Sequence, residues 1–310
     1  MSFGALFAKQ SKEYALHRPT YPPALFDAID QFASSVAAAA TTAGKASSSS
    51  GAARHERALD VACGSGQATL ALAERYNEVI GIDSAPEQLD EAPQHPKVSY
   101  LVGSANDIPR SLVADHSCDL VTVAQGFHWF DFPRAFTEIS RVLTKPLAAA
   151  AAAGAAGGAT SGAGATTATA AGVCAVWGYG NPVLENLEAN RHVNVDFYSG
   201  AMGRYWNDRR RHVDNSYSEI EAEMRKHFER VEVNRDSLVI LKEASIADFV
   251  RYVSSWSAYQ TWKKQHPGEV DVLKALERDI CTDYGVESSE AFISFRYPIF
   301  LLLGAVPKAK

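Results

Sequence analysis

The stretch LDVACGSGQATLAL, from Leu59 to Leu72, joins an apolar run, two glycines one residue apart and a segment in which Leu and Ala recur at helical spacing. A short apolar run of this kind predicts a buried strand, and the periodic segment predicts a helix. Gly64 and Gly66 allow the backbone to bend sharply and to approach a ligand closely. The stretch therefore predicts a strand, a glycine turn and a helix, with the turn as a ligand cradle.

The same alternation of strands and helices continues along the chain. Strands are predicted at 57–63, 77–83, 97–103, 118–125 and 172–180, and helices at 68–76, 84–92 and 131–143. Five strands alternating with helices predict a parallel sheet that is covered by helices on both faces. Two further strands, at 230–240 and 296–306, complete an α/β fold with a Rossmann-like, doubly wound, seven-stranded and mostly parallel sheet.

Two low-complexity segments interrupt this pattern. Residues 33–53 and 147–172 consist mostly of Ala, Gly, Ser and Thr, which bury too little side-chain area to offset the entropy lost on ordering. We predict insertions there, within one domain that spans residues 1–310. Two aromatic-rich segments, 184–230 and 245–284, are predicted to be mostly helical and to cover a substrate.

Composition narrows the classes of function. The chain has 310 residues, 46% of them hydrophobic and 21% charged, which is typical of a soluble globular protein. A net charge of -6 disfavours nucleic-acid binding and favours a small-molecule substrate. No apolar stretch predicts a membrane span and no signal peptide is evident, so we expect a cytoplasmic protein with no membrane partner. We expect the protein to be a monomer or a dimer. The four cysteines form no C-x-x-C pair, so we expect reduced thiols and no metal site.

Acidic residues on either side of the glycine turn indicate the ligand. Asp60 lies within the first strand, where a buried carboxylate is costly unless it meets a cation or hydrogen-bond donors. Asp83 ends the second strand, where an acidic side chain can accept both hydroxyls of a ribose. An anion ahead of the turn favours an ammonium over a pyrophosphate. S-adenosylmethionine, which has an ammonium, a ribose and an adenine but no phosphate, is therefore the predicted cofactor.

Two alternatives share part of this pattern. A nicotinamide-dependent oxidoreductase would also use Asp83, but its fingerprint requires a third glycine, whereas Gly64 and Gly66 are followed by Gln67, Ala68 and Thr69. The other alternative is a protein that binds S-adenosylmethionine and has lost catalytic turnover.

The ordered motifs LDVACGSGQ, EVIGIDSAPEQL, VGSANDIP, CDLVTVAQGFHWFD and RVL resemble class I S-adenosylmethionine-dependent methyltransferases, specifically the methyltransferase type 11 family. The stretches QGFHWFD, from Gln125 to Asp131, and YALHRPTYP, from Tyr14 to Pro22, look like the trans-aconitate methyltransferase branch. The resemblance covers Tyr14 to about Gly180 without the two insertions. The later half resembles that branch more faintly, through RYVSSWSAYQ around Trp256.

The resemblance implies a set of cofactor-binding residues. By position they are Tyr14, Arg18, Asp60, Ala62, Gly64, Ser65, Gly66, Asp83, Ser84, Ser104, Ala105 and Gln125. Tyr14, Arg18 and Tyr21 would belong to an N-terminal lid; the alternative is that RPTYPP only caps the helix that follows it. Asp60 and the glycines would line the methionine part. Two residues depart from the family pattern: Ala62 replaces a glycine, and Ser104 stands where an aspartate often meets the adenine.

The expected reaction is methyl transfer to a small-molecule acceptor, at a carboxylate or hydroxyl oxygen, with a trans-aconitate-like acid as one acceptor. A carboxylate needs no base, whereas a hydroxyl does, and His128 is the candidate catalytic base. The alternative is that His128 only packs the wall of the pocket. The candidate substrate-binding residues are Tyr21, Trp129, Tyr179, Arg204, Trp256 and Tyr259. Arg204 is selected from an arginine-rich stretch because apolar residues flank it and an inward arginine would bind an acid. The alternative is that this stretch is a solvated helix face.

Overall fold

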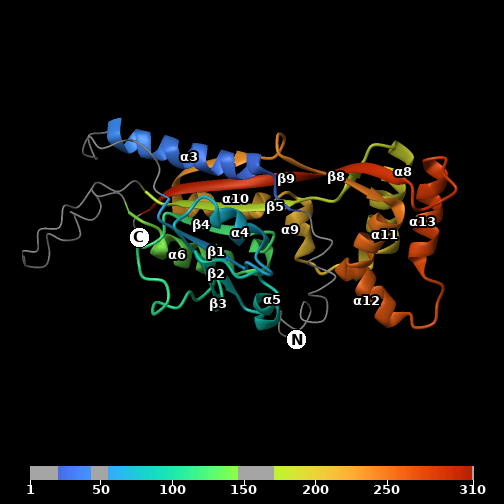
Figure 1. Cartoon of the computed structure of the whole chain (residues 1–310), viewed down its shortest axis with the longest axis horizontal. Helices are drawn as coiled ribbons and strands as arrows, with labels where there is room; N and C mark the ends of the chain where they lie inside the picture. The colour runs from blue at the N-terminus through green and yellow to red at the C-terminus, as the bar shows by residue number, and fades with distance from the viewer. Residues whose placement is uncertain (1–19, 43–54, 146–170, 309–310) are drawn as a thin grey trace, which may run out of the picture. The chain divides into compact units, whose positions relative to one another are not determined.

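The computed structural model describes residues 20–42, 55–145 and 171–308, which divide into two compact units. The sheet unit takes its described residues from Tyr21–Gly178, Tyr217–Asn234 and the segment that begins at Leu301. The helical unit takes Tyr179–Ser216 and Arg235–Phe300. Each unit is described by itself below, with the element labels of Figure 1.

The sheet unit is built on a twisted, mostly parallel sheet. Its strands are β1 (Arg57–Val61), β2 (Glu78–Asp83), β3 (Val98–Val102), β4 (Leu120–Ala124), β5 (Val173–Tyr179), β7 (Phe228–Asn234) and the last part of β9 (Phe292–Pro307). They lie in the order β3-β2-β1-β4-β5-β9-β7, with β1 to β5 parallel to one another and β7 antiparallel to β9. The chain order reverses beside β1, and in such sheets ligands bind beyond the carboxyl ends of the strands at that point.

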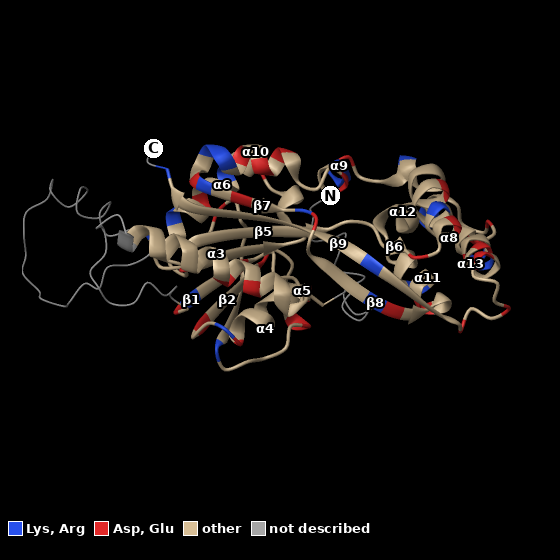
Figure 2. Ribbon diagram, turned by 90° about the horizontal axis from the view of Figure 1, so that it is seen from above, with Lys and Arg blue, Asp and Glu red and all other residues tan. Residues whose placement is uncertain are grey.

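Helices cover both faces of this sheet. They are α3 (Pro23–Thr42), α4 (Gln67–Ala73), α5 (Pro86–Asp90), the 3₁₀-helix η1 (Phe127–Trp129), α6 (Phe132–Val142) and α10 (Ser218–His227). Figure 2 shows α6 and α10 on one side of β5 and β7, with α3 and α4 on the other. Helix α6 forms where the sequence predicted an amphipathic helix, and it buries Phe136 and Ile139 on its apolar face. The mixed α/β fold predicted from the alternating pattern is therefore present.

The first low-complexity prediction is wrong over its first ten residues. Residues 33–42 are not an insertion but the second half of α3, where Val36 and Ala37 are buried. The apolar positions Ile29 and Phe32 recur at helical spacing, and Val36 extends the same buried face by one turn. Packing of this face outweighs the small side chains that surround it. The rest of that segment, 43–53, lies outside the described residues.

The second low-complexity segment begins and ends at neighbouring points of the fold. The Gly172 amide donates to the Thr144 carbonyl at 2.9 Å, and the Thr144 amide donates to the Cys118 carbonyl at 2.9 Å. Ala171 and Gly172 are described and adjoin β5, whereas 147–170 falls outside the described residues. The residues that follow α6 and precede β5 are therefore hydrogen-bonded to each other, and the insertion between them stays a prediction.

The seven-strand prediction is too low. Among the described residues the connected sheet has nine strands, because β6 (Val183–Leu184) and β8 (Val239–Ser245) also pair with β9. The strand predicted at 230–240 is in fact two strands, β7 and β8, which belong to different units. The strand predicted at 296–306 extends back to Phe292, and its 16 residues are long enough to pair in both units.

The helical unit carries most of its chain in short helices. They are α8 (Leu187–Arg191), the π-helix η2 (His192–Ala201), the 3₁₀-helix η3 (Gly203–Tyr205), α9 (Arg210–Asp214), α11 (Ile246–Ser254), α12 (Ser257–Gln265) and α13 (Val272–Asp283). Helix α11 packs against α13 and against the first part of β9, through Phe249 and Phe295 with ring centroids 4.9 Å apart (Figure 1). The predicted helices of 184–230 and 245–284 are thus largely present, and their role as a substrate cover stays a prediction.

None of the helices in the described ranges combines the length and apolar character that a bilayer-spanning helix needs.

Candidate functional site

The glycine turn after β1 has a backbone that few side chains tolerate. Ala62, Gly64 and Gly66 all have positive φ, at 56°, 56° and 84°. A Cβ added to Gly66 would lie 2.5 Å from the Tyr100 hydroxyl, so this position admits no side chain unless Tyr100 moves. Ala62 does carry a methyl group, and a Cβ added to Gly126 would lie 2.9 Å from it. The absence of a side chain at Gly126 therefore makes room for the alanine that replaces the usual glycine.

Asp83 ties this turn to the end of β2. Its Oδ2 accepts from the Gly64 amide at 2.9 Å, and its Oδ1 accepts from the Ala85 amide at 2.9 Å. The side chain is half-buried, and burial raises the pKa of Asp83 against the opposing effect of these amides. Each carboxylate oxygen can accept a second hydrogen bond. Asp83 is thus a preorganised acceptor at the carboxyl edge of the sheet, and its contact with a ribose stays a prediction.

Asp60 lies within β1, as predicted, and two hydroxyl groups of the protein donate to it. It is fully buried, and its two oxygens accept from the Thr69 hydroxyl at 2.7 Å and from the Thr122 hydroxyl at 2.8 Å. These contacts join β1 to α4 and β4, so Asp60 supports the turn from within the core, and its contact with a cofactor stays a prediction. The rule that a buried carboxylate requires donors was correct, but the donors are two threonines that the sequence analysis did not select.

Burial raises the pKa of Asp60 to about 6, while the two threonine hydroxyls oppose the shift. The folded state therefore holds the proton more tightly than the unfolded chain does, and stability falls as pH rises from about 4 to about 6. The two-unit shift corresponds to about 3 kcal/mol. We expect Asp60→Asn to remove this dependence. Because part of the loss occurs below pH 4.5, the free energy of unfolding of the variant relative to that of the native protein should increase by about 2 kcal/mol between pH 4.5 and 7.5.

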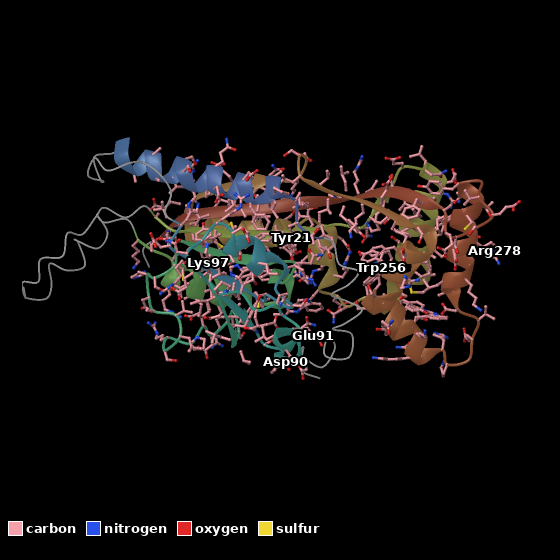
Figure 3. The ribbon with its side chains drawn as sticks, in the orientation of Figure 1. Tyr21, Asp90, Glu91, Lys97, Trp256 and Arg278 are labelled. Atoms are coloured by element: carbon pink, nitrogen blue, oxygen red, sulfur yellow. The ribbon has the colours of Figure 1, made fainter. Side chains whose placement is uncertain are left out.

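Urea denaturation across this pH range measures the effect. The exposed Asp90 of α5, labelled in Figure 3, provides the control Asp90→Asn, whose difference from the native protein should not change with pH. An equally flat difference for Asp60→Asn would contradict the prediction.

The remaining predicted cofactor residues follow the turn, β2, β3 and β4. Ser65 is buried in the turn, and Ser84 is exposed next to Asp83. Ser104 is exposed and accepts from the Asn106 amide at 3.3 Å, whereas Ala105 beside it is buried. Gln125 follows β4 with a φ of 54°, and its amide donates to the Trp177 carbonyl at 2.8 Å. These residues lie at the carboxyl ends of their strands, and their contacts with a cofactor stay predictions.

His128 lies in η1, just beyond β4, and is buried. Its Nδ1 is 2.8 Å from the Tyr217 hydroxyl, and Tyr217 is itself fully buried. Ser216 and Tyr217 both have left-handed backbones, with φ of 52° and 61°, which is costly for residues with side chains. Strain of this kind clusters at functional sites. The sequence analysis missed Tyr217, because no local pattern connects two residues that lie 89 positions apart.

Aromatic rings surround this part of the sheet unit. The Trp129 ring lies 4.8 Å from the His128 ring. Tyr21, labelled in Figure 3, packs edge-on against Trp177 at 5.3 Å. The predicted lid residues Tyr14 and Arg18 lie outside the described residues.

The predicted substrate residues of the helical unit form part of its aromatic packing. Tyr179 is buried against Tyr297, with ring centroids 5.3 Å apart. Trp256, labelled in Figure 3, lies between α11 and α12 and is largely buried. Tyr259 is also buried, and its hydroxyl donates to Asp271 at 2.7 Å. Their substrate-binding roles stay predictions.

The inward arginine is Arg210 and not Arg204. Arg204 is exposed and donates to the Tyr205 hydroxyl at 2.8 Å. Arg210 instead donates to the Tyr198 hydroxyl at 2.8 Å and to Asn181 Oδ1 at 2.7 Å, with 23% of its side chain exposed. Flanking apolar residues were a poor guide, because the direction of each arginine depends on where η3 ends and α9 begins.

Within the described residues no group of three or more His, Cys, Asp and Glu side chains is arranged to hold a metal ion.

Comparison with known proteins gives concordant matches. Residues 59–146 match the family model described as a methyltransferase domain. A Dictyostelium discoideum protein named as a methyltransferase is 27% identical over 97% of this chain and 95% of its own. A Saccharomyces cerevisiae protein named as an S-adenosylmethionine-dependent methyltransferase is 22% identical over 93% of this chain and 94% of its own.

One solved structure is similar over nearly the full length. The structure described as a type II methyltransferase from Anaeromyxobacter dehalogenans has a TM-score of 0.66 and 26% identity, and the match covers 93% of this chain and 98% of that one.

Proposed function

We propose an acceptor chemistry for a chain that is a class I S-adenosylmethionine-dependent methyltransferase, with S-adenosylmethionine as its cofactor. The described residues fit this cofactor. Gly64 and Gly66 leave two positions of the turn without side chains, and Asp83 offers half-buried carboxylate oxygens for the ribose hydroxyls. Asp60 acts indirectly in this proposal, because it holds the turn in place through Thr69 and Thr122.

The proposed acceptor atom is an oxygen of a small molecule, either a carboxylate or a hydroxyl. The observation that supports it is the buried pair of His128 and Tyr217, 2.8 Å apart, at the carboxyl end of β4. A histidine held in one orientation suits an acceptor that must lose a proton. The stretch QGFHWFD that contains His128 also supports the trans-aconitate-like branch as the finer assignment.

When bound, S-adenosylmethionine supplies a methyl group that its sulfonium already activates. The protein therefore has to align an oxygen with that group and exclude water. In our proposal His128 accepts the proton of a hydroxyl acceptor, and Tyr217 fixes the imidazole through Nδ1. An acceptor carboxylate is already ionised at neutral pH, and His128 then orients it without removing a proton.

A transfer experiment tests the proposal. The full chain, with radiolabelled S-adenosylmethionine, is expected to methylate at least one member of a panel of small acids and phenols and no member of a matched amine panel. Binding of S-adenosylmethionine with no transfer to any oxygen acceptor would instead favour a protein without turnover. Label found only on amines would refute the oxygen assignment.

A further inference from the structure

The helical unit encloses one guanidinium in an aromatic cluster. The Arg210 carbon Cζ lies 5.4 Å from the centroid of the Tyr198 ring and 5.0 Å from that of Trp206. Trp256 packs against both rings, at 5.5 Å and 5.8 Å. Tyr198 belongs to the π-helix η2, a backbone form that occurs often at functional sites. We call the three rings with Arg210 the arginine cluster.

In the part of the chain that the structure describes, the Arg210 guanidinium faces a carboxylate only on its Nε side. Its Nε donates to the Tyr198 hydroxyl at 2.8 Å and faces the Asp214 carboxylate at 3.3 Å. That carboxylate also accepts from the Tyr198 hydroxyl at 2.6 Å, so its charge is shared. Among the described residues, Asp214 is the only carboxylate within ion-pair distance of Arg210.

The opposite edge of the guanidinium presents donors. Nη2 donates to Asn181 Oδ1 at 2.7 Å, and Nη1 has no hydrogen-bond partner among the described residues. Because arginine has no acceptor, this contact requires the oxygen of Asn181 to face Arg210, and its amide nitrogen then points elsewhere as a second donor. The Asn181 amide nitrogen likewise has no partner within the described ranges. Since the two side chains are bonded to each other, their remaining N–H groups lie close together.

We propose that Arg210 and Asn181 form a carboxylate-binding subsite for a small acid with a planar, unsaturated or aromatic body. The paired donors match the two oxygens of a carboxylate. The adjoining rings of Trp206 and Trp256 favour a planar apolar body beside that carboxylate. The Arg210 side chain is 23% exposed, and in this proposal the ligand reaches the guanidinium from the exposed side. The subsite concerns binding only, and it does not depend on the proposed methyl transfer.

Calorimetry with the full chain tests the subsite. The probes are benzoate and cinnamate, each matched by its neutral amide. We expect both acids to bind and both amides to bind at least tenfold more weakly. Arg210→Gln is expected to weaken acid binding about 10- to 100-fold, the range for a charge-assisted hydrogen bond. Arg204→Gln, at an exposed arginine nearby in sequence, is expected to leave it unchanged.

A second variant distinguishes the loss of the subsite from a folding defect. Asn181→Asp retains Arg210 and places a carboxylate on the donor edge, where it would pair with the guanidinium and repel an acidic ligand. We expect it to keep the thermal stability of the native protein and to lose acid binding at least tenfold. The subsite is overturned if the native protein binds neither acid, if acids and amides bind equally, or if a folded Asn181→Asp variant binds acids as the native protein does. S-adenosylhomocysteine binding is unaffected in every case, so a defect in the proposed function is recognised separately.

Discussion

Asp83→Ala is expected to weaken binding of S-adenosylmethionine by about 100-fold or more. Asp83 is the acceptor that we assign to the ribose hydroxyls, and a hydrogen bond to a charged group contributes about 1.5–3 kcal/mol. The same substitution also removes the contacts with the Gly64 and Ala85 amides, which hold the turn in place. Calorimetric titration of the purified protein measures the change.

The control for this prediction is Asp90→Ala, which removes an exposed carboxylate on the neighbouring helix α5 (Figure 3). It is expected to bind the cofactor as the native protein does. Circular dichroism of both variants without ligand checks that the fold is retained. Equal affinity of a folded Asp83→Ala variant and the native protein would remove Asp83 from the site.

His128→Ala is expected to lower kcat/KM about 10²- to 10⁴-fold with a hydroxyl acceptor, which is the usual contribution of a general base. The limb of the pH profile that reports the general base should be absent from the variant. With a carboxylate acceptor the loss should be less than about tenfold, since no proton has to be removed. Steady-state rates across pH 5 to 9 therefore also identify the acceptor atom.

Two further variants separate chemistry from packing. Tyr217→Phe keeps the buried ring but removes the hydroxyl that contacts His128, so it should shift the same limb of the profile and reduce kcat more than it raises KM. His227→Ala is the control, because it removes another histidine of the sheet unit, one that pairs with Glu223 on α10. It should leave the pH profile, kcat and KM unchanged. A hydroxyl acceptor that is methylated by His128→Ala at the native rate would show that His128 only packs the site.

The sequence predicted those parts of the fold that depend on neighbours along the chain. The alternation of apolar runs and helical segments is local, and so the strands β1 to β5 and the helix α6 appear where they were expected. Local patterns failed where long-range pairing decides. Residues 230–240 were predicted as one strand, yet they contribute to two strands, β7 and β8. The reason is that β7 pairs with the second half of β9 and β8 pairs with its first half.

The candidate site divides in the same way. Gly66 and Asp83 were recognisable from the sequence, because a glycine turn and an acid at the end of the next strand have fixed positions in this type of sheet. The threonines that donate to Asp60 were not recognisable from the sequence. Neither was the inward direction of Arg210, in place of Arg204. Each depends on which surfaces meet after folding.

The sequence by itself thus determined the sheet type, the turn and its acidic partner, since these follow from short-range patterns along the chain. Only the tertiary structure decided that Tyr217 holds His128 and that Asn181 holds Arg210. Hydrogen bonds between distant residues depend on side-chain direction and burial, which are set when the whole core packs.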